Sequence, residues 1–270
     1  MHRKLAIGTA LFLILGLAGC GHGQHLLLLV AESVTPDAIF RLDTEGERVI
    51  FLTIDDGPSV HTDAILNMLE EYDATATFFV HADHIPGHED VVIRTLDGGH
   101  RLANHMPADE NTKKLSPSDF EDAFISAHST IASYGETPTY FRPPLGKYNP
   151  DTMSGVLNAY AYTEDDEGRM FVLGSFLPWE AGGLTETGWG TFNRTMARTY
   201  GRQLGGASFP GAIVVFHDGP RLKRTENTLI SLEAFLRITE HRGYRVEALP
   251  QPRLAQQEFN EGRQALASSP

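Results

Sequence analysis

Two adjacent carboxylates are the first feature of the sequence that suggests chemistry. Asp55 and Asp56 follow an apolar run and precede Gly57-Pro58. Neighbouring carboxylates repel each other unless a cation or an arginine compensates their charge. Their side chains diverge, so one can bind a metal while the other faces a substrate. Gly57 and Pro58 favour a tight turn, and a plain turn would by itself also explain these four residues.

Three later segments carry basic or imidazole side chains after short apolar runs. His105 follows residues 99–104, Arg142 begins the rigid stretch Arg142-Pro143-Pro144-Leu145-Gly146, and His217 ends the run 212–217. Imidazole and carboxylate groups are common ligands of divalent metals, and a histidine also suits proton transfer near neutral pH. Asp109, four residues after His105, adds a further carboxylate.

The elements that must position these residues alternate along the chain. Apolar and β-branched runs predict strands at 49–54, 74–80, 99–104, 139–142, 171–176, 212–217 and 244–249. Helical spacing predicts helices at 62–72, 89–96, 116–133 and 226–242, the third beginning with the capping residues Ser116, Pro117 and Asp119. Gly21 to Leu42 is interpreted as a tether with a short apolar segment, 26–30.

This alternation predicts an α/β fold, a distorted, TIM-barrel-like (β/α)7 barrel of a single domain. The carboxyl ends of the strands in such a barrel converge on one mouth. Asp55, Asp56, His105, Arg142 and His217, each at or just after a predicted strand end, should therefore meet there.

In their order and spacing these segments resemble the polysaccharide deacetylase family, carbohydrate esterase family four, and its nodulation-type chitooligosaccharide deacetylase domain, over roughly residues 48–250. The resemblance implies removal of N-acetyl groups from N-acetylated sugars with a divalent metal ion. It also implies a role for each matching residue: Asp55 the catalytic base, Asp56 and His105 metal ligands, Arg142 the residue that holds the base, His217 the general acid, and the backbone N–H of Leu145 a donor to the oxyanion.

Asp109 departs from the family's pattern, which usually has a second histidine at this position. A site of Asp56, His105 and Asp109 would neutralise a divalent ion and favour harder ions, such as manganese or cobalt, over zinc. The alternative is that Asp109 is an ordinary loop acid and metal affinity is reduced.

The family's fourth motif matches only loosely. Glu180 is a weak candidate for orienting the catalytic histidine, and Trp179 for lining the sugar site; a surface acid and a core indole explain them equally well. His81, His84 and His88 follow a predicted strand at irregular spacing, and we expect a solvated or packing role for them.

The N-terminus has the pattern of a bacterial lipoprotein signal. A basic start, residues 2–4, precedes an apolar run and the sequence Leu17-Ala18-Gly19-Cys20, which resembles a lipobox and contains the chain's one cysteine. We expect a signal peptide at 1–19, lipidation of Cys20, a tether and N-terminal segment at 20–42, the deacetylase domain at 43–250 and a loose polar tail at 251–270. The protein would then lie in the cell envelope, anchored to a bacterial membrane and facing the periplasm or the exterior.

The amino-acid composition limits which classes of binding partner are expected. The formal charge of −13, without a cluster of Lys and Arg, argues against nucleic acid as the main partner. The expected partner is an N-acetylated glycan: peptidoglycan, a chitin-like oligomer or poly-N-acetylglucosamine. Two alternatives stay open, a carbohydrate-binding lipoprotein with weakened catalysis and an O-acetyl esterase on the same fold.

Overall fold

The computed structural model describes residues 21–160, 170–176, 194–219 and 222–251. Its central element is β1 (Val49–Asp55), an apolar strand buried along its whole length. β1 pairs in parallel with β2 (Thr77–Val80), β4 (Ile213–His217) and β5 (Arg245–Glu247). β3 (Arg101–Asn104) extends the sheet beyond β2, which gives the order β3-β2-β1-β4 with β5 also on β1.

Isolated bridges continue this sheet toward a distorted barrel. Asn104 at the end of β3 bridges to Phe141, Phe141 to Phe171, Ile39 to Val172, and Arg41 to Ala212 just before β4. The α/β barrel predicted from the sequence is therefore confirmed, with a difference of detail. The strands predicted at 139–142 and 171–176 are reduced to these bridges.

Alternation along β1 divides the core into two faces. Ile50, Leu52 and Ile54 pack outward, in a cluster that includes residues of α3 (Thr62–Glu71) and α8 (Leu222–His241). Val49 and Phe51 belong to a separate inner cluster. Because side chains alternate along a strand, Asp55 lies on the same side as Val49 and Phe51. A polar group is thus placed at the end of an inward strand face that begins with the apolar Val49 and Phe51.

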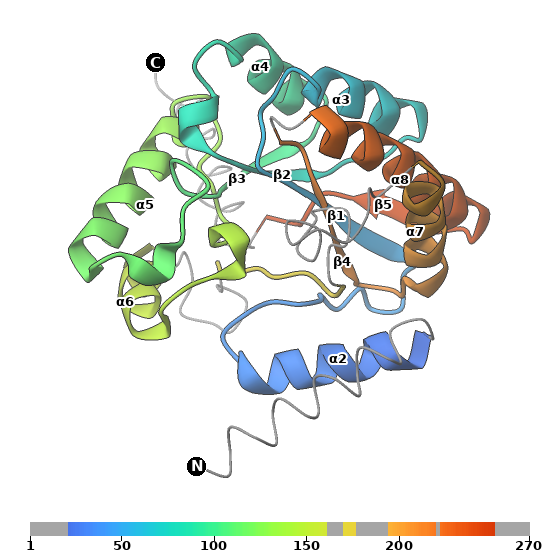
Figure 1. The fold of residues 1–270 in the computed structure, drawn as a ribbon, viewed down its shortest axis with the longest axis horizontal. Helices are drawn as coiled ribbons and strands as arrows, with labels where there is room; N and C mark the ends of the chain where they lie inside the picture. The colour runs from blue at the N-terminus through green and yellow to red at the C-terminus, as the bar shows by residue number, and fades with distance from the viewer. Residues whose placement is uncertain (1–20, 161–169, 177–193, 220–221, 252–270) are drawn as a thin grey trace, which may run out of the picture.

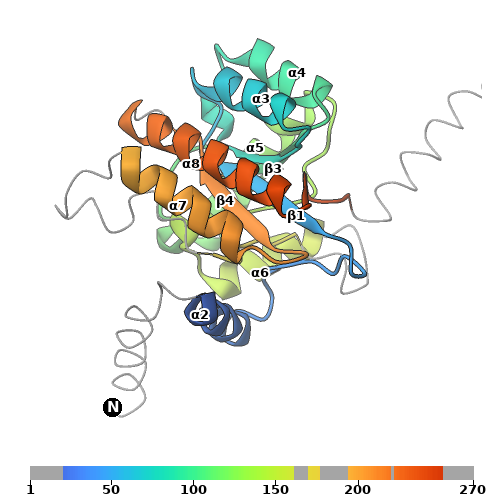
Figure 2. The ribbon, with the colours of Figure 1, turned by 90° about the vertical axis from the view of Figure 1, so that its right-hand side faces the viewer.

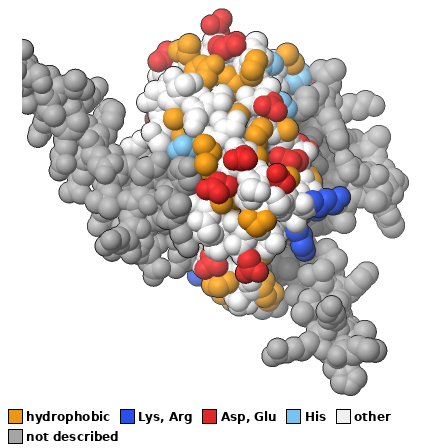
Figure 3. Space-filling model, turned by 90° about the vertical axis from the view of Figure 1, so that its left-hand side faces the viewer, with side chains coloured by type: hydrophobic (Ala, Val, Ile, Leu, Met, Phe, Trp, Pro, Cys, Tyr) orange, Lys and Arg blue, Asp and Glu red, His pale blue; other side chains and the backbone are white. Residues whose placement is uncertain are grey.

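Helices surround the sheet (Figures 1 and 2). Besides α3 and α8 these are α4 (Glu89–Asp97), α5 (Pro117–Ala132), α6 (Pro150–Tyr160) and α7 (Arg194–Ala207). The predicted start of α5 is confirmed, because the Ser116 side chain accepts a hydrogen bond from the Asp119 N–H. Figure 3 shows the α5 side of the molecule, where acidic side chains are scattered over the surface, in keeping with the net negative charge.

The expectation of a tether after Cys20 is corrected by α2 (Gly21–Val34). This helix runs along one side of the molecule (Figure 1), and Leu28 is buried in a cluster with Phe40 and Phe171. Within the apolar segment 26–30, Leu28 is buried, whereas Leu29 and Val30 are exposed. Among the described residues, no helix is long and apolar enough to span a membrane.

α7, which the sequence pattern does not predict, packs closely on α8. A Cβ at Gly201 would lie 2.0 Å from the Ser231 carbonyl oxygen, and one at Gly205 would lie 3.0 Å from that of Phe235. The two glycines therefore let the helix backbones approach more closely than any larger residue would allow.

Candidate active site

The strand register brings the polar residues of separate segments to one edge of the sheet. Asp55, the last residue of β1, is in register with His217 at the end of β4 and with Phe79 of β2. His81 is the first residue after β2, and His105 the first after β3. Because parallel strands end at the same edge, the side chains of these four polar residues gather at the mouth of the barrel, where the sequence predicts all of them except His81.

Arg142 holds Asp55 inside the barrel. Its Nη1 donates to Asp55 Oδ1 and, at 3.0 Å, to Thr53 Oγ1, while its Nε donates to the Val172 carbonyl at 3.1 Å. The guanidinium also lies over the Phe79 ring, 4.1 Å from the centroid. Both charged groups are buried, with 4% of Arg142 and 3% of Asp55 exposed. The arginine therefore fixes the orientation of the Asp55 carboxylate and compensates its charge.

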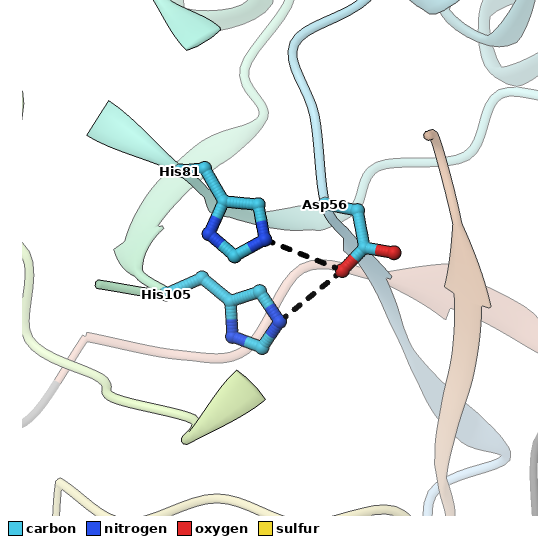
Figure 4. A group of neighbouring side chains, drawn as sticks. All are labelled: Asp56, His81 and His105. Carbon is cyan, nitrogen blue, oxygen red and sulfur yellow. Dashed lines mark ion pairs between the residues drawn. The ribbon is translucent and has the colours of Figure 1, made fainter. Parts of the chain in front are cut away.

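Asp56, His81 and His105 form a buried group able to hold a metal ion. Oδ1 of Asp56 lies 3.6 Å from His81 Nε2 and 3.4 Å from His105 Nε2. Figure 4 shows both imidazoles directing Nε2 at the same carboxylate oxygen. One ligand atom from each residue lies within 4.8 Å of the others. Two imidazoles and one carboxylate are a common donor set for zinc and related divalent ions.

The protonation states of these three residues also suit the binding of a metal ion. His105 Nδ1 lies 2.7 Å from the Arg142 carbonyl, which can only accept, so Nδ1 carries the proton and Nε2 is left free to bind an ion. Burial lowers the pKa of His81, more than the nearby Asp56 carboxylate raises it, and so favours the neutral imidazole that a metal requires. Burial tends to raise the pKa of Asp56, but the nearby imidazoles of His105 and His81 hold it well below its ordinary value. Both nitrogens of His81 are buried without a hydrogen-bond partner, as expected of a side chain whose partner is an ion.

His81 corrects one expectation drawn from the sequence. We expected a solvated or packing role, but the side chain is fully buried and directed at Asp56. Spacing along the chain hides this residue, since it lies far from the other ligands in sequence. The rule applied to Asp55 and His105 would have found it, because His81 also directly follows a strand of the same sheet.

Asp109 does not join this group. Its side chain is exposed, and the metal-capable group found among the described residues contains His81 instead. The geometry therefore favours His81 over Asp109 as the third ligand.

Of the remaining predicted residues, two lie within the described part of the chain and three lie outside it. His217 is buried at the end of β4, close enough to Asp56 to lower the pKa of that carboxyl. Leu145 lies in the short turn Pro144–Gly146 with a left-handed backbone, φ 59°, and an exposed side chain. Trp179, Glu180 and Cys20 lie outside the described residues.

Asp218 is a buried acid beside the site that sequence reasoning did not single out. Its carboxylate accepts hydrogen bonds from Ser59 Oγ, at 2.6 Å, and from Thr62 Oγ1, and its N–H donates to the Asp55 carbonyl at 2.7 Å. A Cβ at Gly57 would lie 2.9 Å from Asp218 Oδ2. Asp218 therefore ties the end of β4 to the turn after Asp56, and a residue larger than glycine at position 57 would displace the Asp218 carboxylate.

Comparison with known proteins agrees with this geometry. A family model described as polysaccharide deacetylase matches residues 43–164, which include Asp55, Asp56, His81, His105 and Arg142. The chain is 25% identical over 225 residues to a chitooligosaccharide deacetylase of Bradyrhizobium sp. (strain ANU 289), covering 77% of this chain and 92% of that protein. The chain resembles the polysaccharide deacetylase family over residues 43–164 and chitooligosaccharide deacetylases over most of its length. It is thus a hydrolase of carbon–nitrogen bonds other than peptide bonds.

Further similar proteins support the fold over most of the chain. A chitooligosaccharide deacetylase of Rhizobium leguminosarum bv. trifolii is 29% identical over 76% of this chain and 92% of its own length. A solved peptidoglycan N-acetylglucosamine deacetylase superposes with a TM-score of 0.67 at 21% identity, covering 82% of this chain and 95% of that one. A Bacillus anthracis protein described as a pseudoenzyme of the same family superposes with a TM-score of 0.61 at 18% identity, covering 80% of this chain and 68% of that one. Likeness at this level establishes the fold, and the residues of the site must carry the argument for activity.

Proposed function

We propose that the protein is a metal-dependent deacetylase that hydrolyses the N-acetyl groups of a glycan and releases acetate. One observation carries the proposal. Asp55, fixed by Arg142, lies beside the Asp56–His81–His105 group, with its Oδ2 4.0 Å from His105 Nε2. A general base is thus held next to a set of metal ligands, in the arrangement that hydrolysis of an amide by an activated water requires.

Each residue then has a distinct task. A divalent ion bound at the group would polarise the acetamide carbonyl and lower the pKa of a water toward ~7. Asp55 takes the proton of the water that adds to the carbonyl carbon. His217, in register with Asp55 on the neighbouring strand, donates a proton to the nitrogen as the carbon–nitrogen bond breaks. The backbone N–H of Leu145 stabilises the negative charge that develops on the carbonyl oxygen.

The main competing function is glycan binding without turnover. It is raised by the family pseudoenzyme among the structural neighbours and by the absence of the usual histidine at position 109. A binding protein, however, has no need for a buried carboxylate locked by an arginine. Retention of Asp55, Arg142 and His217 in one site therefore favours catalysis.

Acetate release from a panel of glycans tests the proposal. The panel holds N-acetylglucosamine oligomers, peptidoglycan and poly-N-acetylglucosamine, with an O-acetylated polysaccharide to detect esterase activity. The chain is first stripped with a chelator and then supplied with zinc, manganese or cobalt. We expect metal-dependent acetate release from at least one N-acetylated glycan and none from Asp55→Asn. Glycan binding without acetate release under every metal would favour the binding protein.

We also propose His81 as the third ligand, and two variants decide between it and Asp109. His81→Ala should weaken zinc binding by more than the ~10–100-fold that loss of an outer hydrogen-bond partner costs, because a ligand itself is removed. Asp109→Ala should bind zinc as the unsubstituted chain does. The reverse pattern would assign the ligand to Asp109.

For localisation we propose a lipid anchor at Cys20, supported by the basic start, the apolar run and the lipobox-like sequence. The site would then act on a glycan of the cell envelope. A Cys20→Ala variant should leave the membrane fraction or stay unprocessed. Unchanged membrane association of this variant would place the anchor elsewhere.

A further inference from the structure

The segment 81–84, which follows β2, braces both turns that carry the other two ligands. The His81 N–H donates to the Gly57 carbonyl at 2.9 Å, on the turn after Asp56. The N–H of Ala82 donates to the Met106 carbonyl at 3.2 Å, directly after His105. One short segment thus supplies a ligand of its own and contacts the backbone beside the other two.

Both of these turns need such support. Asp56 and Met106 have left-handed backbones, with φ of 73° and 66°. A residue other than glycine in this region is strained by about 1–3 kcal/mol and persists only when its surroundings hold it. The conformation at Asp56 matters most for the site, because it sets the direction of a ligand carboxylate.

His84 is the side chain of this segment that acts on Asp56. Its Nδ1 lies 2.9 Å from the Asp56 carbonyl oxygen. A carbonyl only accepts, so Nδ1 carries the proton and donates. His84 thus bonds to the carbonyl of the strained Asp56, while the His81 N–H bonds to the next carbonyl, that of Gly57.

The same ring also orients His81. The two rings meet edge to face, with centroids 5.0 Å apart and planes at 80°. On its other side His81 stacks on His105 at 4.7 Å. Since neither nitrogen of His81 has a hydrogen-bond partner, ring packing is what fixes the direction of its Nε2.

We propose that His84 is a positioning residue of the metal site, which holds Asp56 through its hydrogen bond and His81 through its ring without binding the ion. The proposal rests on the proposed function, in that the Asp56–His81–His105 group binds a divalent ion. His84 itself is not part of that group among the described residues, and its Nδ1 is already engaged.

Zinc affinity of the full chain tests the proposal, measured by competition with a chromophoric chelator. His84→Phe keeps a ring but loses the donor, whereas His84→Asn keeps a donor amide near the position of Nδ1 and loses the ring. His88→Phe is the matched control: His88 lies one turn further, bonds to the His84 carbonyl and touches neither turn. Urea denaturation of each protein in chelator verifies that it is folded; if His84→Phe is not, His84→Ala replaces it.

We expect His84→Phe to bind zinc about 10-fold or more weakly, within the range known for outer partners of metal ligands. His84→Asn should recover most of that loss, and His88→Phe should bind as the unsubstituted chain does. Unchanged affinity in His84→Phe, or an equal loss in His88→Phe, would overturn the assignment while leaving the metal site intact. If the unsubstituted chain bound no zinc, manganese or cobalt, the metal site and the role of His84 would fall together.

Discussion

The buried pair of Asp55 and Arg142 allows a quantitative test of how the site is held. In Arg142→Met the apolar side chain fills a similar volume, but Asp55 loses its cation while 3% exposed and next to a second carboxylate, Asp56. Removing one partner of a buried ion pair costs about 3–5 kcal/mol of unfolding free energy. We therefore expect a loss of about 4 kcal/mol in the metal-free protein.

Asp55→Asn should cost less. The amide oxygen can still accept from Arg142, which keeps its bonds to Thr53 and Val172, and Asp56 still lies near the guanidinium. The double variant lacks both charges. Its loss of unfolding free energy should therefore be smaller than the sum of the two single-variant losses, by about 1–3 kcal/mol, as is usual for residues in direct contact.

Urea denaturation of the four proteins at pH 7, with chelator present, gives this coupling energy directly. The lost bonds from Arg142 to Thr53 and Val172 affect the single and the double variant alike, so they cancel in the cycle. If the two losses simply add, the charge pair does not hold the site, and the proposed role of Arg142 in orienting Asp55 is wrong.

Three further predictions concern the separate roles of the site residues and the stability of the barrel. Asp55→Asn should abolish acetate release with metal content nearly intact, whereas Asp56→Asn should lose both; equal metal loss measured in the two purified variants would contradict the division of roles. His217→Ala should lower kcat by about 10² or more at little change in unfolding free energy, and a kinetically silent variant would remove His217 from the mechanism. Burial lowers the pKa of His100 to about 4, and its Nδ1 accepts the Ala76 N–H. Between pH 6.5 and 4 the unfolded chain therefore binds more protons than the folded chain. As the pH is lowered through this window, the unfolding free energy should fall by up to about 3 kcal/mol. His100→Gln should flatten this fall; the same slope in both proteins would place the titration elsewhere.

Sequence reasoning located those parts of the site that chain position alone defines. Asp55, His105 and His217 lie at or just after the ends of predicted strands, so the geometry of a parallel barrel is enough to bring them together. Sequence reasoning failed for His81, because that residue was judged by its spacing to His84 and His88 along the chain. Its neighbours in space are residues of two other strands, and only the order β3-β2-β1 shows that the end of β2 lies between them.

The fold was predictable where the pattern is local and less so where packing decides. β1 and the cap of α5 follow from apolar runs and from Ser116, and both are confirmed. α7 contains Gly201, Gly205 and Gly206, whose intrinsic preference disfavours a helix. Contact with α8 overrides that preference, because Gly201 and Gly205 permit the close approach of the two backbones. No local pattern carries that information.

The position of Asp55 and Asp56 at the end of β1 has a consequence for how the protein loses activity. β1 is buried throughout and hydrogen-bonded to β2, β4 and β5, so its amide hydrogens should be among the last to exchange with deuterated solvent. Strands of this kind open only when the whole domain opens. The Asp55 and Asp56 carboxylates would then stay in place as outer helices fray, and heating should destroy the site and the fold in a single step.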